Sequence, residues 1–172
     1  MKVVSYTGNG DIGWGVDAND DVWYRGGYLE QWEKVTGSLK YISVSADGNH
    51  VWGVNYKDII FYRKGKNDFW KSMQGRAKQI SVSGDGEHVY SVDRNNDLHY
   101  IKGYPGFFLL DKRALWNMNK GMKEVSVSQS GNHIYGVDED DNLWHTEGIN
   151  TPWTSLGVAA KSVSVVNEDE IW

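Results

Sequence analysis

The sequence predicts an all-β protein, specifically a β-propeller with four complete four-stranded blades and a partial fifth. Three observations lead to this prediction. A unit of about 40 residues repeats along the chain, each unit contains short alternating segments separated by glycine turns, and aromatic residues are abundant. The 172 residues include nine Trp, ten Tyr and four Phe, but only two Pro. This composition suits many short strands joined by tight turns.

One lysine marks the start of each unit. The five anchors are Lys2, Lys40, Lys78, Lys123 and Lys161, which lie 38, 38, 45 and 38 residues apart. The predicted repeats are therefore 2–39, 40–77, 78–122 and 123–160, with a partial repeat at 161–172. A chain of this length fits one domain, so we expect a single propeller domain over 1–172.

The first two strands of each unit follow from local pattern. Ser alternates with Val or Ile in the opening segment, as at 42–45, and a period of two indicates a strand. The small Ser is expected to let an aromatic side chain of the neighbouring blade approach closely. A glycine turn leads to a second strand, whose central aromatic residue we expect to pack between blades. These aromatic residues are Trp14, Trp52, Tyr90 and Tyr135.

The third and fourth strands complete the unit. An Asp/Asn-rich turn precedes an aromatic third strand, and the fourth strand centres on one Trp per unit: Trp32, Trp70, Trp116 and Trp153. Four short antiparallel strands per unit are typical of a propeller blade. A β-prism or an open solenoid would produce similar repeats, and both remain alternatives at this stage.

The partial fifth unit leaves three ways to complete the ring. These are a five-bladed ring with a two-stranded last blade, a smaller closed ring with an extra flap, and closure by a second chain. Unpaired strand edges invite pairing, so we expect a homo-oligomer contact either there or at the apolar loop Tyr104–Leu110. This loop holds the seven extra residues of the third unit, and folding back onto the blade rim is the alternative.

Charge and composition exclude several classes of partner. The formal net charge is −5 and no Lys/Arg cluster occurs, which argues against nucleic acid as a partner. Cys is absent, so neither disulfides nor thiolate chemistry is available. No apolar run is long enough for a transmembrane segment or a signal peptide. We therefore expect a cytoplasmic protein, with non-classical release as a further route.

Residues 32–55, which read WEKVTGSLKYISVSADGNHVWGVN, resemble the tectonin repeats of fungal and slime-mould tectonins, fish-egg lectins and tachylectin. The resemblance covers all four units, although familiar members close six blades. It implies a multivalent carbohydrate-binding lectin for cell-surface or microbial glycans, such as lipopolysaccharide-type or methylated sugars, with a role in innate defence. The alternative is an intracellular propeller scaffold that binds a protein or an acidic lipid head group.

Two sets of residues are candidate sugar ligands. His50, His88 and His133 follow equivalent glycine turns beside Asn49, Glu87 and Asn132, and their polar atoms suit sugar hydroxyls. The alternative is that these residues only hydrogen-bond within the turn. Aromatic rings near strand ends can stack on the C–H groups of a sugar, and the candidates are Trp23, Trp32, Trp70, Trp144 and Trp153.

The acidic turns allow a weak calcium alternative. Asp138, Asp140 and Asn142 alternate as the first ligands of a calcium loop do, but the Gly and Glu expected later in an EF-hand loop are missing. Asp and Asn are common in plain turns, so we expect a turn and no required cofactor. No catalytic motif is present, and the chain is predicted not to be an enzyme. The alternative is a glycosidase in which two carboxylates from different blades face each other across a cleft.

Overall fold

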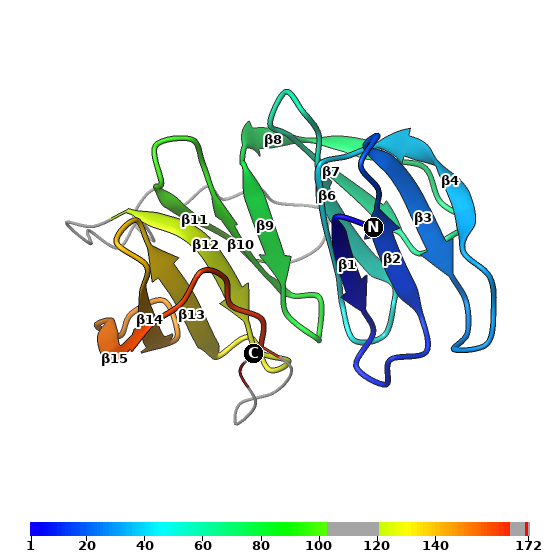
Figure 1. Ribbon diagram of the computed structural model, residues 1–172. Helices are drawn as coiled ribbons and strands as arrows, with labels where there is room; N and C mark the ends of the chain where they lie inside the picture. The colour runs from blue at the N-terminus through cyan, green and yellow to red at the C-terminus, as the bar shows by residue number, and fades with distance from the viewer. Residues whose placement is uncertain (103–120, 166–170, 172) are drawn as a thin grey trace.

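The computed structural model describes residues 1–102, 121–165 and 171, which form fifteen strands in four antiparallel sheets (Figure 1). Sheet 1 contains β1 (Val3–Tyr6), β2 (Gly13–Val16), β3 (Asp21–Arg25) and β4 (Glu33–Ser38). Sheet 2 contains β5 (Tyr41–Val44), β6 (His50–Val54), β7 (Ile59–Lys64) and β8 (Lys71–Arg76). Sheet 3 contains β9 (Gln79–Val82), β10 (His88–Val92) and β11 (Leu98–Lys102). Sheet 4 contains β12 (Met122–Val127), β13 (His133–Asp138), β14 (Asn142–Glu147) and β15 (Thr154–Ala159).

The predicted all-β architecture is confirmed: sheets 1, 2 and 4 have four antiparallel strands, and sheet 3 has three among the described residues. In each sheet the strands lie in chain order, so every neighbour pair is a simple hairpin. The described ranges contain no helix, and hence no helix that could cross a membrane. Trp116 and the Tyr104–Leu110 loop lie outside the described residues.

The first strands of the four sheets lie side by side. β5 is next to both β1 and β9, and β9 is next to β12. A serine hydroxyl joins each strand to the following sheet by accepting a backbone N–H at 3.1–3.2 Å. The pairs are Ser5 with Val44, Ser43 with Val82, Ser81 with Val127, and Ser126 with Val165. The alternating Ser therefore supplies a hydrogen bond between sheets, in addition to being small as the sequence suggested.

The first strands also surround a central cavity of about 410 Å³. Residues from β1, β5, β9 and β12 line it together with Ser162 to Val165 of the last unit. Five consecutive units thus contribute residues to one cavity.

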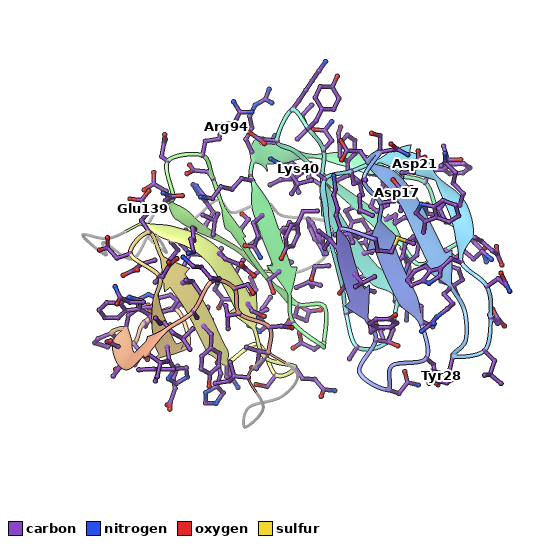
Figure 2. All side chains as sticks on the ribbon, viewed as in Figure 1. Asp17, Asp21, Tyr28, Lys40, Arg94 and Glu139 are labelled. Atoms are coloured by element: carbon purple, nitrogen blue, oxygen red, sulfur yellow. The ribbon has the colours of Figure 1, made fainter. Side chains whose placement is uncertain are left out.

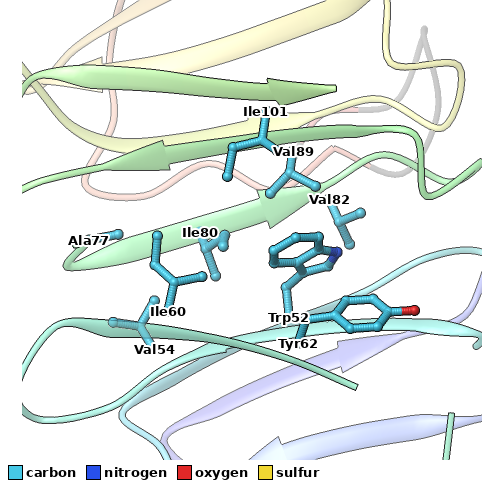
Figure 3. Packing of buried hydrophobic residues seen from close by; sticks show 9 residues of the cluster. All are labelled: Trp52, Val54, Ile60, Tyr62, Ala77, Ile80, Val82, Val89 and Ile101. Atoms are coloured by element: carbon cyan, nitrogen blue, oxygen red, sulfur yellow. The ribbon is translucent and has the colours of Figure 1, made fainter. Parts of the chain in front are cut away.

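Apolar residues pack where one sheet faces the next. The central aromatic residues predicted to fill these interfaces are buried, with exposed fractions of 0% for Trp14, 1% for Trp52, 3% for Tyr90 and 5% for Tyr135. Between sheets 2 and 3, Trp52 packs with Ile80 and Val89 from the opposite side (Figure 3). Burying an aromatic side chain of about 150–250 Å² contributes about 4–6 kcal/mol before entropy is counted.

The lysine that marks each repeat fixes the turn between the second and third strands. Lys40, for example, forms an ion pair with Asp58, whose backbone has the left-handed φ of 63° that Asp and Asn tolerate best. The equivalent pairs are Lys2 with Asp20, Lys78 with Asn96, and Lys123 with Asp141. The lysine period therefore reflects one repeated contact within each sheet.

Candidate functional site

The predicted histidine site is built on a hydrogen-bonded turn. In sheet 2, the Ser45 hydroxyl donates to the Asp47 carboxylate and accepts the backbone N–H of His50 at 3.0 Å. Asp47 in turn accepts the backbone N–H of Asn49 at 2.9 Å. Sheet 3 repeats these contacts with Ser83, Asp85, Glu87 and His88, and sheet 4 with Ser128, Ser130, Asn132 and His133. Three equivalent turns therefore place their side chains alike.

Each histidine is half-buried and uses Nδ1 inside its own sheet. His50 Nδ1 lies 3.4 Å from the Tyr62 hydroxyl, and His88 Nδ1 lies 2.9 Å from the Tyr100 hydroxyl. In sheet 4 the third-strand residue is His145, whose Nε2 lies 3.1 Å from His133 Nδ1. Burial, followed by the charge of His133, lowers the pKa of His145.

Two of the histidines also contact the glycine turn of the next sheet. A Cβ at Gly86 would lie 2.4 Å from Cδ2 of His50, and a Cβ at Gly131 would lie 2.5 Å from Cδ2 of His88. In sheet 1, Ile12 occupies the same place against Gly48. His50 and His88 therefore pack between sheets, whereas the neighbouring Asn49 and Glu87 are exposed.

The tryptophan candidates fall into two groups. Trp23 and Trp144 are half-buried third-strand residues whose indole N–H donates to Asp17 and Asp138, each at 2.9 Å. Hydrogen bonds, first that from Trp23, hold the pKa of Asp17 below its usual value. Sheet 3 has His99 with Asp93 at these positions, and sheet 2 has Phe61 with Asn55. An Asp therefore occurs in the three sheets whose third-strand ring carries an N–H, and sheet 2, whose Phe61 has no N–H, has Asn55 instead.

The second group lies one residue before the fourth strand of sheets 1, 2 and 4, and not at its centre as the sequence suggested. Trp70 donates its indole N–H to the Thr36 carbonyl of sheet 1 at 2.9 Å and lies 6.4 Å from Trp14. Trp153 packs against the cluster formed between sheets 3 and 4. Trp32 lies on sheet 1 near Tyr6, with ring centroids 6.4 Å apart. Trp70 and Trp153 therefore serve sheet packing, while Trp32 lies on a face that no described sheet covers.

The possible calcium ligands form a plain turn. Asp138 Oδ1 accepts the backbone N–H groups of Asp140 and Asn142 at 2.9 and 2.8 Å, and Oδ2 accepts the Trp144 N–H. Throughout the described ranges no group of three or more His, Asp or Glu side chains could hold a metal ion. The predicted turn is therefore present, and calcium binding by these residues stays a prediction.

A groove between sheets 2 and 3 was not anticipated from the sequence. Its volume is about 510 Å³, and Ile60 and Ile101 line it together with the polar Arg94, Asn95 and His99. Gly75 also lines the groove, and it occupies the repeat position of Gly37, which contacts Trp70 at the preceding interface. Only the three-dimensional arrangement brings these residues together.

An ion-pair cluster borders this groove. Asp58 is 2% exposed and binds both Lys40 of its own sheet and Arg94 of sheet 3. Burial raises the pKa of Asp58, but the hydrogen bonds and charges of Lys40 and Arg94 outweigh it and leave the pKa below 3.8. The carboxylate thus stays ionised and links two sheets beside the groove.

A model of the Tectonin domain matches residues 2–172. The chain belongs to the tectonin family. The resemblance found in residues 32–55 is therefore confirmed, and it extends over nearly the whole chain. Tectonin domains are a lectin-type, β-propeller family and not a known class of enzyme. A search of curated proteins finds no match.

Proposed function

We propose that this tectonin chain is a multivalent lectin that binds cell-surface or microbial glycans. The observation that carries the proposal is the threefold repetition of one turn, which sets an exposed Asn or Glu beside a half-buried His. Amide, carboxylate and imidazole groups are the donors and acceptors that sugar hydroxyls require. The turns belong to sheets whose first strands are hydrogen-bonded to one another, so their spacing is fixed.

Repetition compensates for weak individual sites. A dissociation constant of about 1 mM corresponds to only about −4 kcal/mol, but linking several sites on one rigid body can raise the apparent affinity about 10²–10⁴-fold. Weak sites copied around a propeller would therefore hold a glycan-coated surface while releasing a free monosaccharide.

The test uses a triple variant in the exposed turn residues, Asn49→Ala, Glu87→Ala and Asn132→Ala. A matched control changes three exposed polar residues elsewhere, Asn19→Ala, Asn67→Ala and Asp97→Ala, and removes the same amount of charge. On a glycan array and in cell agglutination, the first variant is expected to lose binding and the control to retain it. Equal binding by both variants, or a stoichiometric protein partner unaffected by sugars, would contradict the proposal.

A further inference from the structure

One face of sheet 1 is not covered by any described sheet, although the equivalent face of sheet 2 is buried. Val4 and Tyr6 of β1 are 47% and 42% exposed, whereas Ile42 and Val44, at the same positions of β5, are 2% and 6% exposed. Sheet 1 covers Ile42 and Val44. The uncovered face also has more aromatic surface, because Tyr6 replaces a valine of the other repeats.

Arg25 lies among three aromatic rings on this face. Its Cζ is 5.3 Å from the ring centroids of Tyr6 and Trp32 and 5.8 Å from that of Tyr28. Tyr28 is 75% exposed, at the lower end of sheet 1 in Figure 2. The rings thus form a box that holds a guanidinium by cation–π contacts and remains open to solvent.

The donors of Arg25 are largely unused. Within the described part of the chain, its only hydrogen bond is a long one, 3.4 Å from Nη2 to the Tyr6 hydroxyl, and its Nε is buried without a partner. No carboxylate among the described residues forms an ion pair with it. A guanidinium carries five N–H donors, so this site has an unmet demand for acceptors.

The equivalent residue of sheet 2 shows what this position otherwise does. Arg63 donates from Nε to the Gly65 carbonyl at 2.9 Å and from Nη2 to the carbonyls of Lys66 and Asp68. In sheet 4, Thr146 donates to carbonyls of the same loop. Sheets 2 and 4 thus have a side chain at this position that hydrogen-bonds to the loop before the fourth strand, and sheet 3 has Ile101 there. Arg25 donates no hydrogen bond to a carbonyl of its own loop among the described residues.

We propose that Arg25, with Tyr6, Tyr28 and Trp32, binds the carboxylate of an acidic sugar of the uronic acid class. The guanidinium edge offers paired donors to a planar carboxylate, and the flat rings of Tyr28 and Trp32 can contact the C–H face of the sugar. The chain carries a net charge of −5, so general attraction of anions is not the source of this selectivity. The inference rests on the proposed sugar binding and adds a ligand class and a site distinct from the histidine turns.

Titration of the full chain with glucuronate and with glucose, followed by NMR, tests the proposal. Because hydrogen bonds between charged partners are stronger than neutral ones, glucuronate is expected to bind at least about tenfold more tightly than glucose. Arg25→Gln should abolish this preference, and Arg25→Lys should retain only part of it, since Lys lacks the planar fork. Tyr28→Ala removes a ring that contacts the C–H face of the sugar, so it should weaken the binding of glucuronate. Because Tyr28 is exposed, Tyr28→Ala is expected to fold normally, and a loss of binding in this variant is not explained by unfolding.

Arg76→Gln is the matched control, because Arg76 is an exposed arginine on sheet 2 and its loss changes the net charge equally. It should leave the preference intact. Equal affinity for glucuronate and glucose, unchanged glucuronate binding by Arg25→Gln, or occupation of this face by a second copy of the chain would overturn the proposal. If binding of neutral glycans persists in those cases, the lectin proposal stands and only the Arg25 site fails. Glucuronate binding without any neutral glycan binding would support the Arg25 site and contradict sugar binding at the histidine turns.

Discussion

Substituting Gly86 with alanine tests whether His50 is a packing residue between sheets 2 and 3. Gly86 has a φ of +76°, and a Cβ there would lie 2.4 Å from His50 Cδ2. Ordinary van der Waals contacts begin near 3.4 Å, so the new methyl group overlaps the imidazole by about 1 Å. The left-handed conformation costs about 1–2 kcal/mol for alanine, and the overlap adds about 1–3 kcal/mol.

Gly10 provides a control with the same backbone strain. Its φ is +75°, but no atom lies within 4 Å of the position that a Cβ would take. Gly10→Ala should therefore lower the free energy of unfolding by only about 1–2 kcal/mol, and Gly86→Ala by about 2–5 kcal/mol. Urea denaturation followed by tryptophan fluorescence and circular dichroism measures both values.

A third variant isolates the contact itself. In a His50→Ala background the overlap is gone, so the additional effect of Gly86→Ala should fall to that of Gly10→Ala. Equal losses for Gly10→Ala and Gly86→Ala in the wild-type background would refute the reasoning. So would a Gly86→Ala penalty that is independent of His50.

Three further predictions concern the contacts between and within sheets. Ser43→Ala removes the acceptor of the Val82 N–H and should lower the free energy of unfolding by about 1–3 kcal/mol, as measured by chemical denaturation. Ser164→Ala is the control: Ser164 has the same repeat position but is exposed, so this variant should change the free energy of unfolding by less than about 0.5 kcal/mol. The pKa of Asp58 is lowered on folding, so its contribution to stability is present above pH 3.8 and is lost as the pH falls through the folded value. Asp58→Asn should be less stable at neutral pH and lose less stability than wild type on acidification below about pH 4, and a parallel loss in both proteins would contradict this. The pKa of His145 is also lowered, and the unfolded chain therefore takes up its proton first below pH 6.5. His145→Tyr, which restores the His–Tyr pair of sheets 2 and 3, should lose less stability than wild type between pH 7.5 and 5.5.

The sheets were predictable because each residue pattern has a local cause. Alternation of Ser with Val or Ile favours a strand, and glycines such as Gly10 and Gly86 indicate turns because glycine tolerates the positive φ that the structure shows there. Trp14 and Trp52 were assigned to packing because a central aromatic residue on a strand is buried when both faces of a sheet are covered.

The contacts between sheets were not predictable in detail, because they join residues far apart in the sequence. The hydrogen bond from the Val82 N–H to Ser43 spans 39 residues, and its acceptor had been interpreted only as a small side chain. The groove beside Arg94 likewise depends on the placement of sheet 2 against sheet 3. The Arg25 site was not predicted from the sequence, because Arg25 and Arg63 occupy the same repeat position. Only the structure shows that Arg63 donates hydrogen bonds to loop carbonyls and that Arg25 does not.

The histidine turns were also only partly predictable from the sequence. Their spacing identified three equivalent positions, but sequence alone could not separate a ligand residue from a packing residue. The structure gives His50 and His88 a packing contact with the next glycine turn and leaves Asn49 and Glu87 exposed. A sugar at these turns would therefore meet the exposed side chains first.

The most direct measurement of the central claim is an amide NMR titration of the labelled chain with a sugar selected from a glycan array. The account predicts that the amides of Asn49, Glu87 and Asn132 shift together with one common midpoint, since the same turn is copied three times. A response confined to one of the three turns, or none at saturating sugar, would contradict it.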